Sequence, residues 1–455
     1  MKTRMNFKDE FYQKLKLLVL PIAIQNFMLA LVSATDAIML GWIDQTSLSA
    51  VSLAGQVPFV LSLFISGIAA GAGIMAAQYW GKQDAASIEK VIPIALRTNL
   101  LFSGLFTILA GFCPEMLMRI FTNDAALVAS GSQYLRAVAL SYVLCGISQV
   151  YLILLKNTGH AAVSSRISST AVVLNIILNA ILIYGLCGAP ALGIRGAAYA
   201  TVAARVVELI WAYLETKKPE RVRILWNRLF SSAGKILSED FWRYTLPVLA
   251  ASLVWGIAYV LYSVIMGHMG SDAVAANSIT SIAKSLLSCL IRGVSGGAGV
   301  LIGNLLGANE LEKAREYGGR LSHLSIAIGI VTGGLLMLIS PAIVHFAPLS
   351  DTAAEYLQYM LLFCGLNLMA QSVNTTVLDG IFCAGGDAKF DMQGNIGAMW
   401  CFSVPLGFLA AFWLKLPVMV VYCIVNLDEI VKLPAVYHHY KKYIWVRNIT
   451  RDIED

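Results

Sequence analysis

The sequence predicts an all-α integral membrane protein with twelve transmembrane helices, arranged as two parallel six-helix lobes around a central cleft. Three observations support this prediction. The chain of 455 residues is 58% hydrophobic and only 13% charged, whereas a soluble protein carries about 25% charged residues. Its apolar runs provide about twelve spans of ~20 residues with short connections. Its second half also repeats its first half at a constant offset of 226 residues.

The repeat is visible without gaps. LPIAIQNF, which begins at Leu20, aligns with LPVLAASL, which begins at Leu246, so that Pro21 falls on Pro247. Further along, the glycines at 41, 67, 71, 73 and 81 fall on those at 267, 293, 297, 299 and 307. Each copy is too long for a solenoid repeat, and repeated halves in an apolar chain are typical of a transporter. Six spans per half place both halves in the membrane with the same orientation.

The apolar runs give the expected elements in order. The first lobe is expected over 1–214, with spans at 17–40, 52–78, 91–112, 133–155, 167–186 and 194–214. A basic cytoplasmic linker covers 215–241. The second lobe is expected over 242–436, with spans at 242–267, 278–303, 319–340, 355–380, 392–412 and 416–436, and a cytoplasmic tail follows at 437–455. Glycines four apart in the second span of each half favour close helix packing.

The positive charge is distributed as in a membrane protein. With the N-terminus in the cytoplasm, 25 of the 33 Lys and Arg residues fall in cytoplasmic segments and four fall outside: Arg119, Arg136, Arg195 and Lys415. This asymmetry predicts that both termini are cytoplasmic, by the positive-inside rule. It explains the net charge of +6 without a nucleic-acid partner, and leaves contact of the linker with anionic lipid as a lesser alternative. The first apolar run has no cleavage site and is expected to be retained.

Cysteine and histidine do not indicate a metal centre. The eight Cys residues are scattered singly, mostly within apolar runs, and form no CxxC pair, so they are expected to be small core residues. His438 and His439 are adjacent in the polar tail and are expected to be solvated.

Asp36 is the strongest candidate for function. It lies in ALVSATDAIML, within the first apolar span. A carboxylate there keeps its charge only beside a cation or hydrogen-bond donors, and otherwise takes up a proton. A capped carboxylate near the outer helix end is the alternative. Its counterpart in the second half is Tyr262, so a coupling site is expected in the first lobe alone.

Asn175, Asn179 and Thr201 are candidate partners of Asp36. The two asparagines are four residues apart in VLNIILNAILIYG and share one face of the fifth span. Thr201, in GAAYATVAAR, reaches a similar depth from the other side of the membrane. Together these oxygens would suit a hard cation. The alternative is that the asparagines only join helices through hydrogen bonds.

Ordered motifs over nearly the whole chain resemble the multidrug and toxic-compound extrusion (MATE) transporters. They include LPIAIQNF, DAIMLGWID, GIAAGAGIMAAQYWGKQD, GNLLGANELEKARE and CAGGDAKF. The resemblance implies export of amphipathic, often cationic compounds in exchange for Na⁺ or H⁺, with Asp36, Asn175 and Thr201 at the cation site. It also implies that Pro21 bends the first helix and that the protein lies in the cytoplasmic membrane of a prokaryote.

Two departures from the family pattern affect the site. Many relatives carry an acid at the position of Asn179, so this chain has one formal charge fewer. Another branch has an essential Glu where Trp255 stands, eight residues after Pro247. A carboxylate-based site is therefore not expected in the second lobe, and Asp379 is expected near the cytoplasmic mouth.

Lys284 and Arg292 interrupt the apolar eighth span. They are eight residues apart and so project from about the same face. Together with Trp255 they are candidates for the substrate cleft, where they would favour an anionic or zwitterionic substrate. Ion pairs at the lobe interface are the alternative.

The sequence thus predicts a cation-coupled antiporter that works by alternating access. It is expected to act as a monomer on small organic substrates in contact with lipid, with no cofactor, no nucleic acid and no metal beyond Na⁺. A lipid-linked precursor flippase is one rival, with Arg97, Arg205, Lys284 and Arg292 as scattered candidates for binding pyrophosphate. An integral membrane enzyme is another, but the sequence has no nucleophile elbow, HExxH or P-loop motif.

Overall fold

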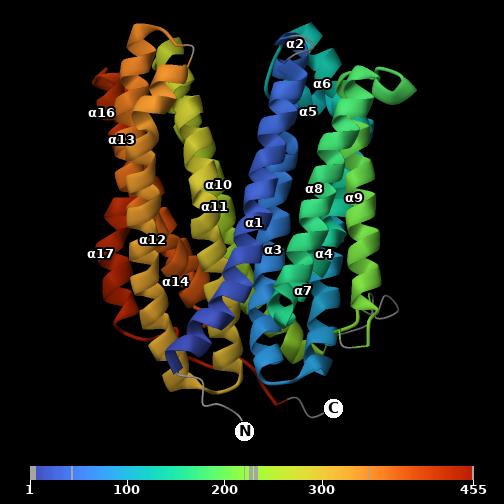
Figure 1. Ribbon diagram of the computed structural model, residues 1–455, viewed down its shortest axis with the longest axis vertical. Coiled ribbons are helices and arrows are strands. Elements are labelled where there is room, and N and C mark those ends of the chain that lie inside the picture. Colours follow the sequence, from blue (N-terminus) through green and yellow to red (C-terminus); the bar gives the residue numbers. More distant parts are fainter. Residues whose placement is uncertain are drawn as a thin grey trace. The chain divides into compact units, whose positions relative to one another are not determined.

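The computed structural model describes residues 7–41, 45–219, 221–224, 229, 234–347 and 349–452. Every regular element in these ranges is a helix (Figure 1). Ten helical segments within them are long and apolar enough to cross a membrane. The prediction of an all-α membrane protein is therefore confirmed.

The first half of the chain begins with α1 (Phe7–Gly41), which contains Pro21. The elements that follow are α2 (Gln45–Ala54), α3 (Gln56–Gly81), α4 (Ala85–Phe112), α5 (Pro114–Arg119), α6 (Ala125–Val138), α7 (Leu140–Leu155), η1 (Lys156–His160), α8 (Ala161–Tyr184), η2 (Leu186–Gly188) and α9 (Ile194–Thr216). The side chain of Asp84 caps α4, and that of Asp124 caps α6, by accepting backbone N–H bonds at the helix start.

The second half begins with α10 (Lys235–Gly267), which contains Pro247. The elements that follow are α11 (Ser271–Gly307), α12 (Leu311–Phe346), α13 (Asp351–Thr375), η4 (Thr376–Phe382), α14 (Ala388–Asn395), η5 (Ile396–Ser403), α15 (Val404–Phe408), η6 (Leu409–Trp413), α16 (Val418–Val425) and α17 (Asp428–Tyr440). The turns η4, η5 and η6 are π-helical, a distortion that often accompanies functional sites.

Two features reconcile ten apolar helical segments with twelve spans. The segment Leu140–Tyr184 turns back on itself at Gly159, whose φ is +82°, and Ser164 Oγ donates to the carbonyl of Leu152 at 3.1 Å across the turn. It therefore contains two spans. The last span is divided into α16 and α17 at Asn426 and Leu427, so that neither piece alone is long enough to be counted.

The chain forms two compact units that differ from the two sequence halves. Of the described residues, those within 27–249 form the N-unit, and those within 7–26 and 250–452 form the C-unit. The boundaries fall inside α1 and α10, so each unit includes the first part of the long helix that opens the other half. The expected lobes 1–214 and 242–436 describe the sequence repeat, whereas the units describe packing.

Close glycine contacts explain this exchange in the N-unit. A Cβ at Gly67 would lie 2.8 Å from Cα of Leu249, and one at Gly71 would lie 2.7 Å from Cα of Thr245. The first part of α10 therefore packs directly against α3, at a distance that only glycine permits.

The C-unit repeats this contact at the same offset. A Cβ at Gly293 would lie 2.9 Å from Cα of Ala23, and one at Gly297 would lie 2.8 Å from Cγ2 of Val19. Each of these four residues is 226 positions from its counterpart in the N-unit contact. The packing expected from the glycine spacing is thus present in both copies of the repeat.

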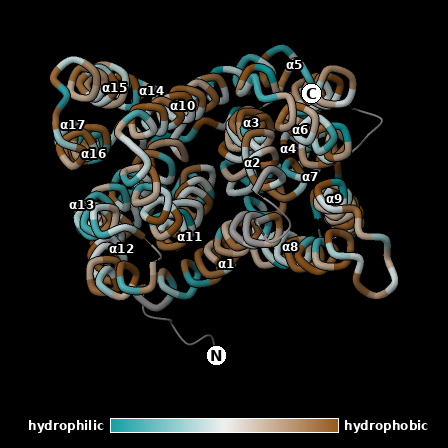
Figure 2. The backbone as a smooth tube through the Cα atoms, turned by 90° about the horizontal axis from the view of Figure 1, so that it is seen from above, coloured by the Kyte–Doolittle hydropathy of each residue, from teal (hydrophilic) through white to brown (hydrophobic). Residues whose placement is uncertain are grey.

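Large apolar side chains are exposed on the surface of both units. Leu101 is 69% exposed, Leu338 is 78% exposed and Trp413 is 83% exposed. Exposure of this extent is typical of surfaces that face lipid. Figure 2 looks along the helices and shows hydrophobic stretches on, among others, α8, α9 and α10.

Candidate functional site

A chain of hydrogen bonds joins Asp36 to α8 and α9. Nδ2 of Asn179 donates to Oδ1 of Asp36 at 2.5 Å and to Oδ1 of Asn175 at 3.2 Å. Nδ2 of Asn175 donates to Oγ1 of Thr201 at 3.3 Å, and the hydroxyl of Thr201 donates to the carbonyl of Ala197 at 3.0 Å. The structure therefore brings together the four residues that the sequence singled out in the first half.

Helix geometry positions these side chains. Asn175 and Asn179 are one turn apart on α8 and present their amides to one face. The hydroxyl of Tyr184 donates to the carbonyl of Met39 at 2.7 Å and ties the end of α8 to α1. Leu40 packs beside the site with Ile183 and Ala197, so the polar chain lies next to an apolar cluster.

Part of the hydrogen-bonding capacity of this site is not used within the described residues. Asn179 is fully buried, and its Oδ1 accepts no hydrogen bond from the described residues. No Lys or Arg forms an ion pair with Asp36 in the part of the chain that the structure describes. One carboxylate, amide oxygens and a hydroxyl form a donor set that fits a small hard cation or a proton.

Pro21 lies inside α1, where it cannot donate the backbone bond of the preceding turn. Five residues later, after Asn26, α1 passes from the C-unit into the N-unit. Pro247 similarly precedes the boundary within α10 at Leu249. The bend expected at Pro21 stays a prediction.

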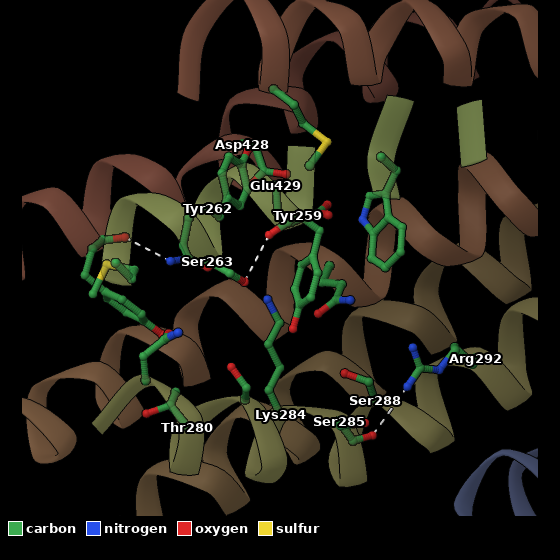
Figure 3. A pocket seen from close by; sticks show the side chains of 18 residues that line it. Tyr259, Tyr262, Ser263, Thr280, Lys284, Ser285, Ser288, Arg292, Asp428 and Glu429 are labelled. Atoms are coloured by element: carbon green, nitrogen blue, oxygen red, sulfur yellow. Dashed lines mark hydrogen bonds between the residues drawn. The ribbon is translucent and has the colours of Figure 1, made fainter. Parts of the chain in front are cut away.

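The C-unit contains a pocket of about 160 Å³. Trp255, Lys284 and Arg292, the three residues proposed from sequence for the substrate cleft, all line it. Trp255 stacks on Tyr259 with ring centroids 5.5 Å apart and planes inclined by 16°. In Figure 3, Lys284 extends from α11 toward Tyr259, and Asp428 and Glu429 lie on the opposite wall.

The contacts of the two basic residues favour the cavity over ion pairing. Nζ of Lys284 donates to Oδ1 of Asn367 at 3.1 Å, and the guanidinium of Arg292 contacts the carbonyl of Ser285 at 3.5 Å. Neither forms an ion pair with an acid among the described residues.

The C-unit contains a buried cluster of carboxylates around Lys432, which was not expected from the sequence. Nζ of Lys432 lies 3.6 Å from Oδ2 of Asp428 and 3.3 Å from Oε1 of Glu429. The same ammonium donates to Oδ1 of Asn395 at 3.1 Å, and Nδ2 of Asn395 donates to Asp391 at 3.1 Å. Lys432 and Asp428 are each only 5% exposed. The charge distribution along the chain places Lys432 with the cytoplasmic residues and does not indicate this network.

A sequence signal for the network was present. NLDEIVKL places Asp428 and Glu429 four and three residues before Lys432, the spacing at which helix side chains meet. Asp379, expected at the cytoplasmic mouth, lies in η4 and interacts electrostatically with Asp391 and Glu429.

Two further expectations change. Arg205, a candidate for binding pyrophosphate, forms an ion pair with Glu208 at 2.7 Å, and Glu208 also accepts from Ser148 at 2.7 Å. His439, expected to be solvated, contacts Oδ2 of Asp387 at 2.7 Å and stacks on Phe390 with ring centroids 3.8 Å apart.

Comparisons with known proteins agree with this arrangement. The MatE family model matches residues 21–181 and 247–409, and the two matched segments begin 226 residues apart, in agreement with the repeat. The uncharacterized transporter YisQ of Bacillus subtilis is 21% identical over 94% of this chain and 93% of its own length. The probable multidrug resistance protein YoeA of the same organism is 21% identical over 99% of this chain and 98% of its own length.

Solved structures support the same fold. The Vibrio cholerae MATE transporter VcmN, in a mutant form, superimposes with a TM-score of 0.86 at 15% identity, and the match covers 96% of this chain and 99% of that one. Because the family model matches more than half of the residues, in two copies that follow the internal repeat, the chain belongs to the MatE family and is a multi-pass membrane protein.

Proposed function

We propose that this protein is an antiporter that couples inward movement of Na⁺ or H⁺ to export of amphipathic organic compounds. The observation that carries the proposal is the hydrogen-bonded chain from Asp36 through Asn179 and Asn175 to Thr201. It places one carboxylate, with no basic partner in the described ranges, next to the unused oxygen of a buried amide. A cation or proton bound there would neutralise the site.

The coupling follows from differential affinity. An ion shifts the balance between outward-open and inward-open states only if it binds one of them more tightly. Asp36 and Asn179 come from different helices, so a change in the position of α1 relative to α8 would alter the affinity of the site. Neutralisation of Asp36 from outside would favour the state that releases substrate, and loss of the ion to the cytoplasm would reset the cycle.

The remaining properties are part of the same proposal. The protein would be a monomeric transporter with no enzymatic activity, no cofactor and no nucleic-acid partner, in the cytoplasmic membrane of a prokaryote. The distribution of Lys and Arg supports cytoplasmic termini. The flippase alternative is weakened because Arg205 already has a carboxylate partner in Glu208.

The test is Asp36→Asn, which keeps an oxygen to accept from Asn179 and removes the charge. We expect coupled efflux to fall more than tenfold, because the neutral amide no longer exchanges an ion. Efflux of a fluorescent aromatic cation and of a fluorescent aromatic anion would be measured from proteoliposomes under separate sodium and pH gradients.

Asp351→Asn, at an exposed position at the start of α13, is the matched control and should leave efflux unchanged. Full gradient-driven efflux by Asp36→Asn would refute the proposed coupling site. The gradient that drives wild-type efflux identifies the coupling ion.

A further inference from the structure

Three donors on one face of α11 point into the C-unit pocket. Lys284, Ser288 and Arg292 follow one another at intervals of four residues and all line the cavity. Ser288 is only 3% exposed, and its hydroxyl has no hydrogen-bond partner among the described residues. Figure 3 shows Ser288 and Arg292 on the same side of the pocket.

The two cations keep donors that the protein does not use. Lys284 has three N–H donors, and its hydrogen bond to Asn367 engages one of them. The guanidinium of Arg292 makes a long contact to the carbonyl of Ser285 and a hydrogen bond with the side chain of Cys289, which leaves other N–H donors of its five for a ligand. A carboxylate, sulfonate or phosphate group accepts several such bonds at once. The planar guanidinium of arginine can donate two parallel hydrogen bonds to such a group.

The acids on the opposite wall already have partners within the protein. Asp428 and Glu429 both lie within ion-pair distance of Lys432, and Oε2 of Glu429 accepts from Nδ2 of Asn374 at 2.7 Å. Lys432 itself does not line the pocket. Lys284 also interacts electrostatically with Asp428 and Glu429, whereas Arg292 forms no ion pair with an acid among the described residues. Arg292 and the spare N–H donors of Lys284 are therefore the positive groups that remain for a ligand.

The third wall is aromatic. Trp255 and Tyr259 stack on each other and both line the cavity. Such a pair offers a flat apolar surface to a ring. A pocket of about 160 Å³ is smaller than the ~300–1,000 Å³ that enclose a whole drug-sized ligand, so it suits one charged aromatic group.

We propose that the C-unit pocket binds the oxyanion of a planar aromatic organic anion. Lys284, Ser288 and Arg292 hold the oxyanion, and Trp255 and Tyr259 contact the ring. The proposal names a substrate class for the export function proposed above and rests on it. A lipid phosphate has related oxyanion chemistry but lacks the ring, and the experiment separates the two.

The experiment uses two fluorescent probes that differ in charge, naphthalene-2-sulfonate and 2-naphthyltrimethylammonium. Binding to the purified full chain in phosphatidylcholine nanodiscs would be measured by calorimetry. We expect the sulfonate to bind at least tenfold more tightly. Lys284→Gln and Arg292→Gln should each weaken sulfonate binding about tenfold, because each removes a charged hydrogen bond.

Controls make each outcome decisive. Lys415→Gln, in an exposed loop of the same unit, should leave sulfonate binding unchanged, and Lys284→Arg should keep most of it. Thermal unfolding of every variant would exclude loss of fold. Equal affinity for the two probes, or unchanged sulfonate binding in Lys284→Gln and Arg292→Gln, would overturn the proposal. So would loss of sulfonate binding when phosphatidylglycerol is added, since the site would then take lipid phosphate.

The result is separable from the coupling test. Binding requires no gradient, so Asp36→Asn should keep the preference for the sulfonate while it loses coupled efflux. Efflux that persists in Asp36→Asn would reject the coupling site whatever the pocket binds. An absent preference for the anion would reject only the substrate class.

Discussion

The neighbour of Asp36 is an amide, Asn179, at a position where the family resemblance leads us to expect a second acid in many relatives. Asn179 donates to Asp36 and leaves its own oxygen without a partner. It therefore stabilises the negative charge in the absence of an ion and offers an additional ligand when an ion arrives. The one formal charge of this site depends on that donor, because no basic residue pairs with Asp36 in the described part of the chain.

Substitution of Asn179 tests this role in two directions. Asn179→Ala removes the donor, and we expect efflux to fall about tenfold, in line with loss of a hydrogen bond to a charged group. Asn179→Asp places a second carboxylate beside the first, and two close like charges bind a proton or cation more tightly. Efflux should then saturate at a lower concentration of the coupling ion.

Initial efflux rates measured against external Na⁺ and against pH would reveal these changes. Asn123→Ala, an exposed position in the same unit, is the control. Wild-type saturation curves in both Asn179 variants would show that Asn179 only joins helices.

At the scale of elements, glycines decide which helices meet. The contact between α3 and α10 and the contact between α11 and α1 use equivalent positions of the repeat. Both contacts flank the proline of a long helix. Thr245 and Leu249 lie two residues to either side of Pro247, and Val19 and Ala23 lie two residues to either side of Pro21. A helix that passes between two units and contains a proline near the boundary is well placed to bend there.

The contact at Gly71 can be tested against a glycine in open space. A Cβ at Gly71 would lie 2.7 Å from Cα of Thr245, whereas one at Gly104 in α4 would meet nothing within 4 Å. Gly71→Ala should destabilise the fold by roughly 1–3 kcal/mol through overpacking. Gly104→Ala should be neutral or stabilise by up to about 1 kcal/mol, because alanine favours helix.

Melting temperatures of the purified proteins would compare these two variants directly. Equal melting temperatures for Gly71→Ala and Gly104→Ala would contradict the close helix contact.

At the scale of the whole molecule, the orientation in the membrane rests on charge. With cytoplasmic termini, the connections that contain Cys113 and Cys187 face outward, and both side chains are exposed. Cys401 is also exposed, but it lies within the apolar η5 segment, where lipid rather than water would cover it.

Labelling of the native cysteines tests this orientation. A membrane-impermeant maleimide applied to intact cells should modify Cys113 and Cys187 and spare Cys401, as peptide mapping by mass spectrometry would show. Cys113→Ser with Cys187→Ser should abolish the labelling. Modification of these two positions only after lysis would reverse the proposed orientation.

The last span shows what the pattern of residues did not reveal. Its apolar run predicts one helix over 416–436, but the chain divides at Asn426 and places Asp428, Glu429 and Lys432 in a buried network. Hydropathy averages over a window, so three charges inside the expected span do not stand out from the apolar residues beside them. Their burial depends on Asn374 and Asn395, which come from helices distant in sequence.

The sequence by itself determined the membrane class, the two-fold repeat and the four residues of the Asp36 site, because hydropathy, offset and helical spacing are local properties that one chain displays directly. The tertiary structure alone decided that the packing units exchange the first parts of α1 and α10, that Lys284 and Arg292 face a cavity, and that Lys432 is buried among acids. The physical reason is that the energy of a charge or a close contact depends on which distant helix lies opposite, and spacing along one helix does not specify that neighbour.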